Sequence, residues 1–367
     1  MWVAVLFRNR ENKRPMLNEI HIENLIAPLL VWYAKNKRSL PWRGIDDPYR
    51  IWVSEIMLQQ TRVEAVIPYY ERFLDALPTI GDLAECDEDR LLKLWEGLGY
   101  YSRVRNMQKA AKKIVDEHGG AMPRAYEEVV ALPGIGPYTA GAITSIAFGL
   151  PQPAVDGNVL RILARVSDDA TDILSAEMKN KVTKALHEAM PQDCPGIFNQ
   201  AMMDLGACVC LPNGTPKCED CPWRPQCLAC KRGTADALPV RVKKTKRRTE
   251  ERTVLLVMDG ERVLLHKRPA KGLLAGLYEL PNIAGNLSEN DAVEAVRQMS
   301  LDPMHIEVLE NAKHLFSHIE WRMKGYLVRV ADAGAFSYGK DYFLIEKETL
   351  RKDFSVPSAF AAYLKYI

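Results

Sequence analysis

A short run of proline and glycine followed by a stretch without helix breakers, at residues 132–148, constrains the fold most strongly. The run reads Leu-Pro-Gly-Ile-Gly-Pro. Glycine permits positive φ and proline removes a backbone donor, so a helix cannot continue through it. Residues 139–148 are small and mostly apolar, and they predict a helix directly after this hairpin. Such a turn directs backbone N–H groups outward at a helix N-terminus, where an anion such as phosphate binds. A Gly-x-Gly alone would be explained at least as well by a surface turn between core helices.

A second helical stretch, residues 49–62, has apolar residues on every side and is predicted to be largely buried. Glu55 lies within it. A buried carboxylate costs free energy unless it is paired, hydrogen-bonded or protonated. Burial raises its pKa above the usual value of about 4.3 and makes it a proton donor near neutral pH. The alternative is a structural ion pair with Arg50 or Arg62.

Asp156 is the second candidate carboxylate. It precedes the helix-like residues 159–163, so a helix N-cap is the simplest interpretation. A neutral acid together with an ionised carboxylate is also what cleavage of a glycosidic bond through an oxocarbenium-like state requires. The separation of the two carboxylates cannot be read from the sequence.

A cysteine-rich segment follows in the second half of the chain. Its principal thiols, separated by seven, two and five residues, are Cys210, Cys218, Cys221 and Cys227. Four thiolates in one loop-rich segment predict a metal or iron–sulfur site, and a disulfide framework is less favoured because no secretory signal precedes them. Iron–sulfur and zinc remain open at this point, since Cys218/Cys221 and Cys227/Cys230 also form two zinc knuckles. Cys208 is an alternative to Cys210 as the first ligand.

The pattern of the chain changes after the cysteines. Residues 253–258 and 262–266 are strand-like and flank Asp259-Gly260, which predicts a β-hairpin. We therefore expect an N-terminal tail at 1–18, a helical region at 19–230, a basic linker at 231–252 and a C-terminal α+β domain at 253–367. A length of 367 residues accommodates two or three domains.

Charge and hydropathy narrow the functional class only slightly. The net charge is +2, but residues 241–248 carry six positive charges and form either a solvated linker or a segment that faces phosphates. No apolar run is long enough to cross a membrane, and the apolar start is too short and wrongly ordered for a signal peptide. We expect a monomer in the cytoplasm, associated with the nucleoid. The first residues are expected to be a tail or an overlong start.

Together these segments resemble the MutY family of adenine DNA glycosylases, within the endonuclease III or helix-hairpin-helix superfamily. The resemblance covers about residues 19–367 and rests on the hairpin and on five further motifs: Leu40-Pro41-Trp42-Arg43, Trp52-Val53-Ser54-Glu55-Ile56-Met57-Leu58-Gln59-Gln60-Thr61, Gly97-Leu98-Gly99-Tyr100-Tyr101, Val155-Asp156-Gly157-Asn158 and Asp204-Leu205-Gly206-Ala207. It implies two helical lobes, a six-helix module with the hairpin and a module that holds a [4Fe–4S] cluster on Cys210, Cys218, Cys221 and Cys227. The family usually has six residues between the first two ligands, where this chain has seven. Turn residues at 212–214 can absorb the extra one.

The resemblance also implies an activity, which is hydrolytic removal of adenine paired with 8-oxoguanine, or with guanine, in double-stranded DNA. Glu55 would protonate the departing adenine, and Asp156 would stabilise the sugar cation, with Tyr138 and Asn158 supporting them. The implied adenine pocket and its surroundings comprise Arg38, Leu40, Trp42, Arg43 and Gln200. The implied DNA contacts are Gln60, Thr61, Leu98, Tyr100, Gly134 and Gly136, with Phe316, Ser317 and His318 inspecting the 8-oxoguanine.

Two positions refine what the resemblance implies. Relatives that also cut the DNA strand carry a lysine just after the hairpin, where this chain has Tyr138, which has no amine to form a Schiff base. The C-terminal domain resembles the Nudix fold, but the stretch after Gly285 lacks the Arg-Glu-x-x-Glu-Glu cluster that binds magnesium in active Nudix hydrolases. We therefore expect a monofunctional glycosylase with a C-terminal recognition module. The alternatives are a related glycosylase for another base, such as mismatched thymine, and a non-catalytic lesion binder.

Overall fold

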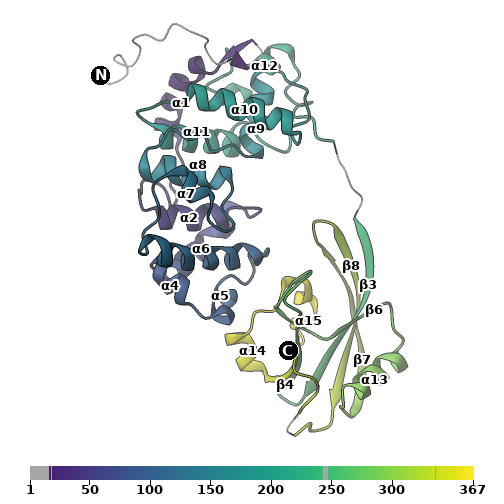
Figure 1. Cartoon of the computed structure of the whole chain (residues 1–367). Helices are drawn as coiled ribbons and strands as arrows, with labels where there is room; N and C mark the ends of the chain where they lie inside the picture. Colours follow the sequence, from purple (N-terminus) through teal and green to yellow (C-terminus); the bar gives the residue numbers. More distant parts are fainter. Residues whose placement is uncertain (1–15, 18, 243–246, 335) are drawn as a thin grey trace. The chain divides into compact units, whose positions relative to one another are not determined.

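The computed structural model describes residues 16–17, 19–242, 247–334 and 336–367. Contacts divide the chain into two compact units. The helical unit comprises the residues up to Ala84 together with Asn106–Lys243, and the sheet unit comprises Glu85–Arg105 together with Lys244–Ile367. Figure 1 labels the helices and strands of both units.

The described part of the helical unit starts with a short pair of antiparallel strands and continues almost entirely as helices. Its elements, including two helices that cross the boundary between the units, are β1 (Met16–Leu17), β2 (Ile20–His21), α1 (Glu23–Asn36), α2 (Pro48–Met57), α3 (Val63–Ala76), α4 (Ile80–Glu85), α6 (Ser102–His118), α7 (Tyr126–Val130), α8 (Pro137–Phe148), α9 (Gly157–Val166), α10 (Ala176–Ala189), α11 (Pro195–Cys208), the 3₁₀ turn η1 (Cys218–Asp220) and α12 (Leu228–Arg232). None of the helices in the described ranges is long and apolar enough to cross a membrane.

Local sequence signals begin and end the helices that matter for the site. Asp47 caps α2 by accepting from the backbone N–H groups of Tyr49 and Arg50, and Pro48 occupies the first turn. Helix α8 begins at Pro137, directly after the glycine hairpin, and ends at Gly149 in the left-handed conformation. The predicted helix after the hairpin is therefore confirmed.

Helix α8 is the central element around which the candidate site is built. It packs against α2, α7 and α11. Close packing depends on Gly141, where an added Cβ would lie 2.4 Å from the carbonyl oxygen of Pro153. The segment that leads into α9 can therefore approach α8 closely, which places the start of α9 beside the helices that carry Glu55 and Tyr138. A large core cluster joins α1, α9, α10 and α11 to the cysteine segment.

The sheet unit contains a seven-stranded sheet with the order β5-β4-β3-β8-β7, with β6 on β3 and β9 on β4. The elements of this unit are α5 (Glu88–Leu94), β3 (Arg248–Asp259), β4 (Arg262–Lys267), β5 (Tyr278–Glu279), β6 (Asn282–Ala284), α13 (Glu289–Gln298), β7 (Pro303–Leu315), β8 (Ile319–Val330), β9 (Tyr342–Glu346), α14 (Lys347–Asp353), the 3₁₀ turn η2 (Ser358–Phe360) and α15 (Ala361–Leu364). Strands β3 and β8 pair in parallel, and β3 and β4 form the predicted antiparallel hairpin around Asp259-Gly260.

Both faces of this sheet are covered, because alternate residues of β3 enter two different core clusters. Val254, Leu256 and Met258 belong to one cluster, and Leu255 and Val257 belong to the other. Helix α13 contributes to the second cluster, while the C-terminal residues contribute to the first. The predicted mixture of a helical region and an α+β domain is confirmed.

Several boundaries differ in detail from the sequence-based expectation. Strand β1 lies inside the predicted tail, and β3 begins at Arg248, inside the predicted linker. Most of the tail and residues 243–246 of the basic run lie outside the described residues. The grouping of residues 85–105 with the C-terminal domain was not foreseen, since nothing in their local pattern departs from that of the surrounding helices.

Candidate active site

Glu55 lies on the buried face of α2, with 5% of its surface exposed. Burial raises the pKa of its carboxyl group, as the sequence predicted, and the nearby charge of Asp156 acts in the same direction. A hydrogen bond from Tyr138 and the charge of Arg43 act in the opposite direction. Among the described residues, Glu55 forms no ion pair with Arg50 or Arg62, the two alternatives, and Arg50 Nε lies 3.5 Å from Asp47 Oδ2 instead.

Tyr138 begins the same helix, α8, that follows the hairpin. Its side chain is hydrogen-bonded to Glu55. Burial, followed by the charges of Glu55 and Asp156, raises its pKa well above the usual value, so the phenol stays neutral. A neutral phenol beside a carboxyl group donates or accepts a hydrogen bond without offering a nucleophilic amine.

Asp156 is the N-cap of α9, as the simplest interpretation of the sequence held. One carboxylate oxygen, Oδ1, accepts from the backbone N–H groups of Asn158 at 2.8 Å and Val159 at 2.9 Å. The other, Oδ2, accepts from the Asn158 side-chain amide at 2.6 Å. Because the N-terminal end of a helix stabilises negative charge, capping is compatible with a role as a fixed counter-charge.

Arg161, which was not predicted from the sequence as a site residue, links Asn158 to the cysteine segment. It is 1% exposed, and its guanidinium donates to Asn158 Oδ1 at 2.8 Å, to the Cys210 carbonyl at 3.0 Å and to the Gly206 carbonyl at 2.9 Å. The spacing of three residues places Asn158 and Arg161 on one face of α9, and this was the available signal. A single buried side chain therefore connects the capped end of α9 with the first cysteine.

Two of the residues expected at the adenine pocket, both arginines, meet at a buried carboxylate. Arg38 and Arg43 both donate to Asp204, which is fully buried on α11. On the same helix, Gln200 accepts a hydrogen bond from Tyr33 of α1 at 2.9 Å. The remaining two expected residues, Leu40 and Trp42, lie in the segment before α2. Trp42 is buried and Leu40 is partly exposed. The ring of Trp42 packs edge-on against that of Tyr70, with centroids 5.2 Å apart.

The positions expected to contact DNA in the helical unit lie at its surface. Gln60, just after α2, is exposed and has a positive φ of 63°, while Thr61 is partly exposed. In the hairpin, Gly134 and Gly136 are exposed at the start of α8. Gly134 has a φ of 76°, and a Cβ there would meet the Asn106 side chain at 2.6 Å. The hairpin thus needs glycine for both its conformation and its packing.

The four principal cysteines line one small cavity, together with Trp223 and apolar side chains of α9 and α11. Arg165 donates to Cys210 Sγ at 3.3 Å, and Cys230 forms a side-chain hydrogen bond with Cys218. Among the described residues, no three His, Cys, Asp or Glu side chains are arranged to hold one metal ion. A mononuclear zinc site requires four ligands at about 2.3 Å from one ion, whereas a [4Fe–4S] cluster spreads its thiolates over several irons. The four thiol groups therefore line one cavity without converging on a single point in the part of the chain that the structure describes.

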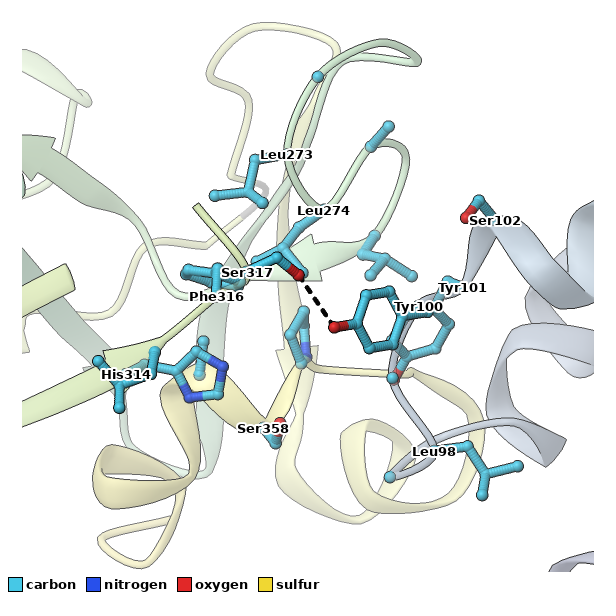
Figure 2. Close-up of a pocket in the computed structure, with 18 of the residues that line it drawn as sticks. Leu98, Tyr100, Tyr101, Ser102, Leu273, Leu274, His314, Phe316, Ser317 and Ser358 are labelled. Carbon is cyan, nitrogen blue, oxygen red and sulfur yellow. Dashed lines mark hydrogen bonds between the residues drawn. The ribbon is translucent and has the colours of Figure 1, made fainter. Parts of the chain in front are cut away.

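The sheet unit contains a second candidate site, a cavity of about 660 Å³. The expected recognition residues Phe316, Ser317 and His318 line it, as do Leu98 and Tyr100. Figure 2 shows the Tyr100 ring pointing to Ser317, whose hydroxyl lies 3.0 Å from that of Tyr100. The structure thus brings together two motifs that are more than 200 residues apart in sequence.

This cavity has an aromatic wall and an exposed polar rim. The rings of His314 and Trp321 lie 4.6 Å and 5.0 Å from that of Phe316, and Trp321 is fully buried. Tyr100, in contrast, is 53% exposed and has a positive φ of 46°. An exposed tyrosine in a left-handed conformation is uncommon and marks a candidate functional position.

The acidic residues after Gly285 do not form a magnesium site in the described part of the chain. Asp291 accepts from the hydroxyl and the backbone N–H of Ser288 and completes a capping box at the start of α13. Glu294 lies 3.6 Å from Arg297 on the same helix. Asp291 and Glu294 therefore have local structural partners within or beside α13.

Comparison with known proteins identifies two families along the chain. Residues 53–192 match the HhH-GPD superfamily of base excision DNA repair proteins, and residues 253–366 match the NUDIX domain. The adenine DNA glycosylase of Mus musculus is 37% identical over 84% of this chain and 71% of its own length. That of Buchnera aphidicola subsp. Baizongia pistaciae is 35% identical over 79% of this chain and 82% of its own length. The solved structure of a thermostable thymine-DNA glycosylase superposes with a TM-score of 0.52 and 26% identity, over 57% of this chain and 96% of that one.

Proposed function

Because the chain belongs to the adenine DNA glycosylase family, we propose that it removes adenine from double-stranded DNA in base excision repair, where adenine faces 8-oxoguanine or guanine. One observation carries the proposal, which is the buried carboxyl group of Glu55. It is hydrogen-bonded to Tyr138, and the charge of Asp156 raises its pKa. A pure DNA-binding protein has no need for such a pair. The adenine must leave the base stack, since the scissile bond is otherwise inaccessible.

The two carboxyl groups divide the chemistry. Burial raises the pKa of the Glu55 carboxyl group and so favours its protonated form. Glu55 donates this proton to the departing adenine, which makes the adenine a better leaving group. Asp156 is held by three donors from the start of α9 and supplies the negative charge that stabilises the developing sugar cation. A water molecule then completes the reaction and leaves an abasic site.

The decisive experiment measures adenine release under single-turnover conditions from matched duplexes. We expect release from A:8-oxoguanine, slower release from A:G and none from A:T. Thymine release from a T:G duplex, without adenine release, would instead favour the activity named for the thymine-DNA glycosylase of similar fold. Binding without release from any duplex would favour a lesion-binding protein.

We expect no strand cleavage to accompany base release, because Tyr138 occupies the position where strand-cutting relatives carry their lysine. The abasic product should break only after added alkali or heat, as seen by denaturing electrophoresis of the same samples. Efficient borohydride trapping of a protein–DNA adduct that depends on position 138 or its neighbours would contradict this. A slow adduct through a distant lysine would not, since abasic aldehydes react with nearby amines.

We also propose that the cavity of the sheet unit reads the base opposite the adenine. Ser317→Ala, and separately Tyr100→Phe, should reduce the preference for A:8-oxoguanine over A:G, because each removes one hydroxyl of the pair at the rim. One polar base contact contributes about 1–3 kcal/mol of discrimination. The measurement is the ratio of single-turnover rates and affinities on the two duplexes at one salt concentration.

The matched control for this prediction is Ser337→Ala, an exposed serine of the same unit that does not line the cavity. Adenine release from A:G should persist in all three variants, since both catalytic carboxylates remain. Point substitutions are preferable to truncation near residue 240, because residues 85–105 belong to the sheet unit and would lose their partners. An unchanged ratio in both cavity variants would assign the reading of the opposite base to the helical unit.

We propose, finally, that Cys210, Cys218, Cys221 and Cys227 hold a [4Fe–4S] cluster. The cluster would tie the loop between α11 and α12 to the core of the helical unit, a structural role. Trp223 anchors the cysteine loop to α1, because its ring is buried and its Nε1 donates to the Leu25 carbonyl at 2.8 Å. Arg165 and Arg161 donate to Cys210 Sγ and to the Cys210 carbonyl, which orients the first ligand.

A further inference from the structure

Asp204 carries a buried carboxylate that accepts several hydrogen bonds in the helical unit. It is not one of the proposed catalytic residues. It is fully buried and accepts four hydrogen bonds from two arginines. Arg38 donates its backbone N–H at 3.1 Å, Nε at 3.0 Å and Nη2 at 2.7 Å, and Arg43 donates Nη2 at 3.1 Å. One carboxylate therefore orients two guanidinium groups of the expected adenine pocket.

Arg43 is the residue through which Asp204 can reach the chemistry. Its charge acts on Glu55 and on Tyr138, and its buried Nε has no hydrogen-bond partner among the residues that the structure describes. Asp204 thus holds Arg43 through one nitrogen, Nη2, at 3.1 Å. An arginine released from Asp204 would have Glu55 as a nearby carboxylate with which to pair.

We propose that Asp204 is a positioning residue that holds Arg43 away from Glu55, so that Glu55 keeps its proton until the adenine arrives. In the same arrangement Asp204 presents the guanidinium groups of Arg38 and Arg43 to the base. An Arg43–Glu55 ion pair would leave Glu55 ionised, with no proton to donate. The proposal rests on the proposed function, because it concerns the acid of that reaction.

The titration of Glu55 depends on the charged and titratable groups that face it. They are Tyr138 from α8, Asp156 at the start of α9, and Arg43 from the segment before α2. Asp204 does not act on Glu55 directly; it acts through the placement of Arg43. Two substitutions should therefore move the same titration in opposite directions, which a merely structural role would not do.

The test is the pH dependence of single-turnover adenine release. In Asp204→Asn, Arg43 turns to Glu55 and favours its ionised form, so the alkaline limb of the profile should move to lower pH. Removing the positive charge in Arg43→Gln should move that limb to higher pH. The plateau rate should fall by up to about 10²-fold in either variant, the loss typical of catalytic groups misplaced by about 1 Å.

Asp169→Asn is the matched control, because Asp169 is also a buried carboxylate of the helical unit but pairs with Lys181, at 2.7 Å. Its profile should match that of the parent. Should Asp204→Asn fail to fold, Asp204→Glu takes its place. Because this variant keeps the charge that holds Arg43, its limb should stay near that of the parent, while Arg43→Gln should still move the limb to higher pH. The proposal is overturned if the limb stays in place in both folded variants, or moves in the same direction in both. Absence of adenine release from the parent protein would overturn the proposed function instead.

Discussion

Glu55→Gln is expected to lower the rate of adenine release about 10²–10⁴-fold, the contribution typical of a general acid. Glutamine has nearly the same shape as a protonated glutamate but cannot donate the proton. Because burial is the main cause of the raised pKa of Glu55, the parent should lose activity as pH rises through that pKa. This alkaline limb should be absent from the residual activity of the variant. The measurement is single-turnover release from an A:8-oxoguanine duplex across pH.

Two controls make the result interpretable. Glu64→Gln changes an exposed glutamate on α3 and should leave the rate and its pH profile unchanged. Duplex affinity of Glu55→Gln, measured at the same salt concentration, should be close to that of the parent, because the residue lies in the interior and not on the DNA-facing surface. Comparable rates for Glu55→Gln and the parent would eliminate Glu55 as the acid.

Loss of a cluster ligand is the second large effect that we expect. Purified protein should contain iron and sulfide and be yellow-brown. Each of the substitutions Cys218→Ser, Cys221→Ser and Cys227→Ser should abolish the iron content. Each should also destabilise or unfold the loop, because ligand binding and folding are coupled in such segments. Cys227 and Trp223 are part of the core cluster that includes α1 and α9, so the damage should lower the melting temperature of the helical unit as well.

The neighbouring cysteines serve as controls and also decide the questions that spacing left open. Cys208→Ser should retain full iron content if Cys210 is the first ligand. Cys230→Ser should do so as well, because Cys230 belongs to the alternative zinc arrangement. Stoichiometric zinc without iron in protein purified anaerobically, with loss of metal in Cys230→Ser, would show that the site is a pair of zinc knuckles.

Local sequence patterns correctly predicted much of the secondary structure near the site. The glycine hairpin predicted the start of α8, and the unbroken apolar pattern predicted the burial of Glu55 on α2. The cap position of Asp156 and the hairpin at Asp259-Gly260 were also predicted correctly. Each of these depends on φ, on helix periodicity or on a side-chain-to-backbone bond within a few residues, so the information is contained in a short window of sequence.

Which distant residues meet was decided only by the tertiary structure. Asp204 binds Arg38 and Arg43 across more than 160 positions, and Tyr100 lies beside Ser317 across 217. The helical pattern of residues 85–105 likewise does not show that they join the sheet unit. Periodicity states which face of a helix is buried, but the partner of that face depends on how the chain packs. The sequence by itself therefore determined the elements and the candidate acid, while packing decided the arginine clamp around Asp204 and the cavity at Ser317.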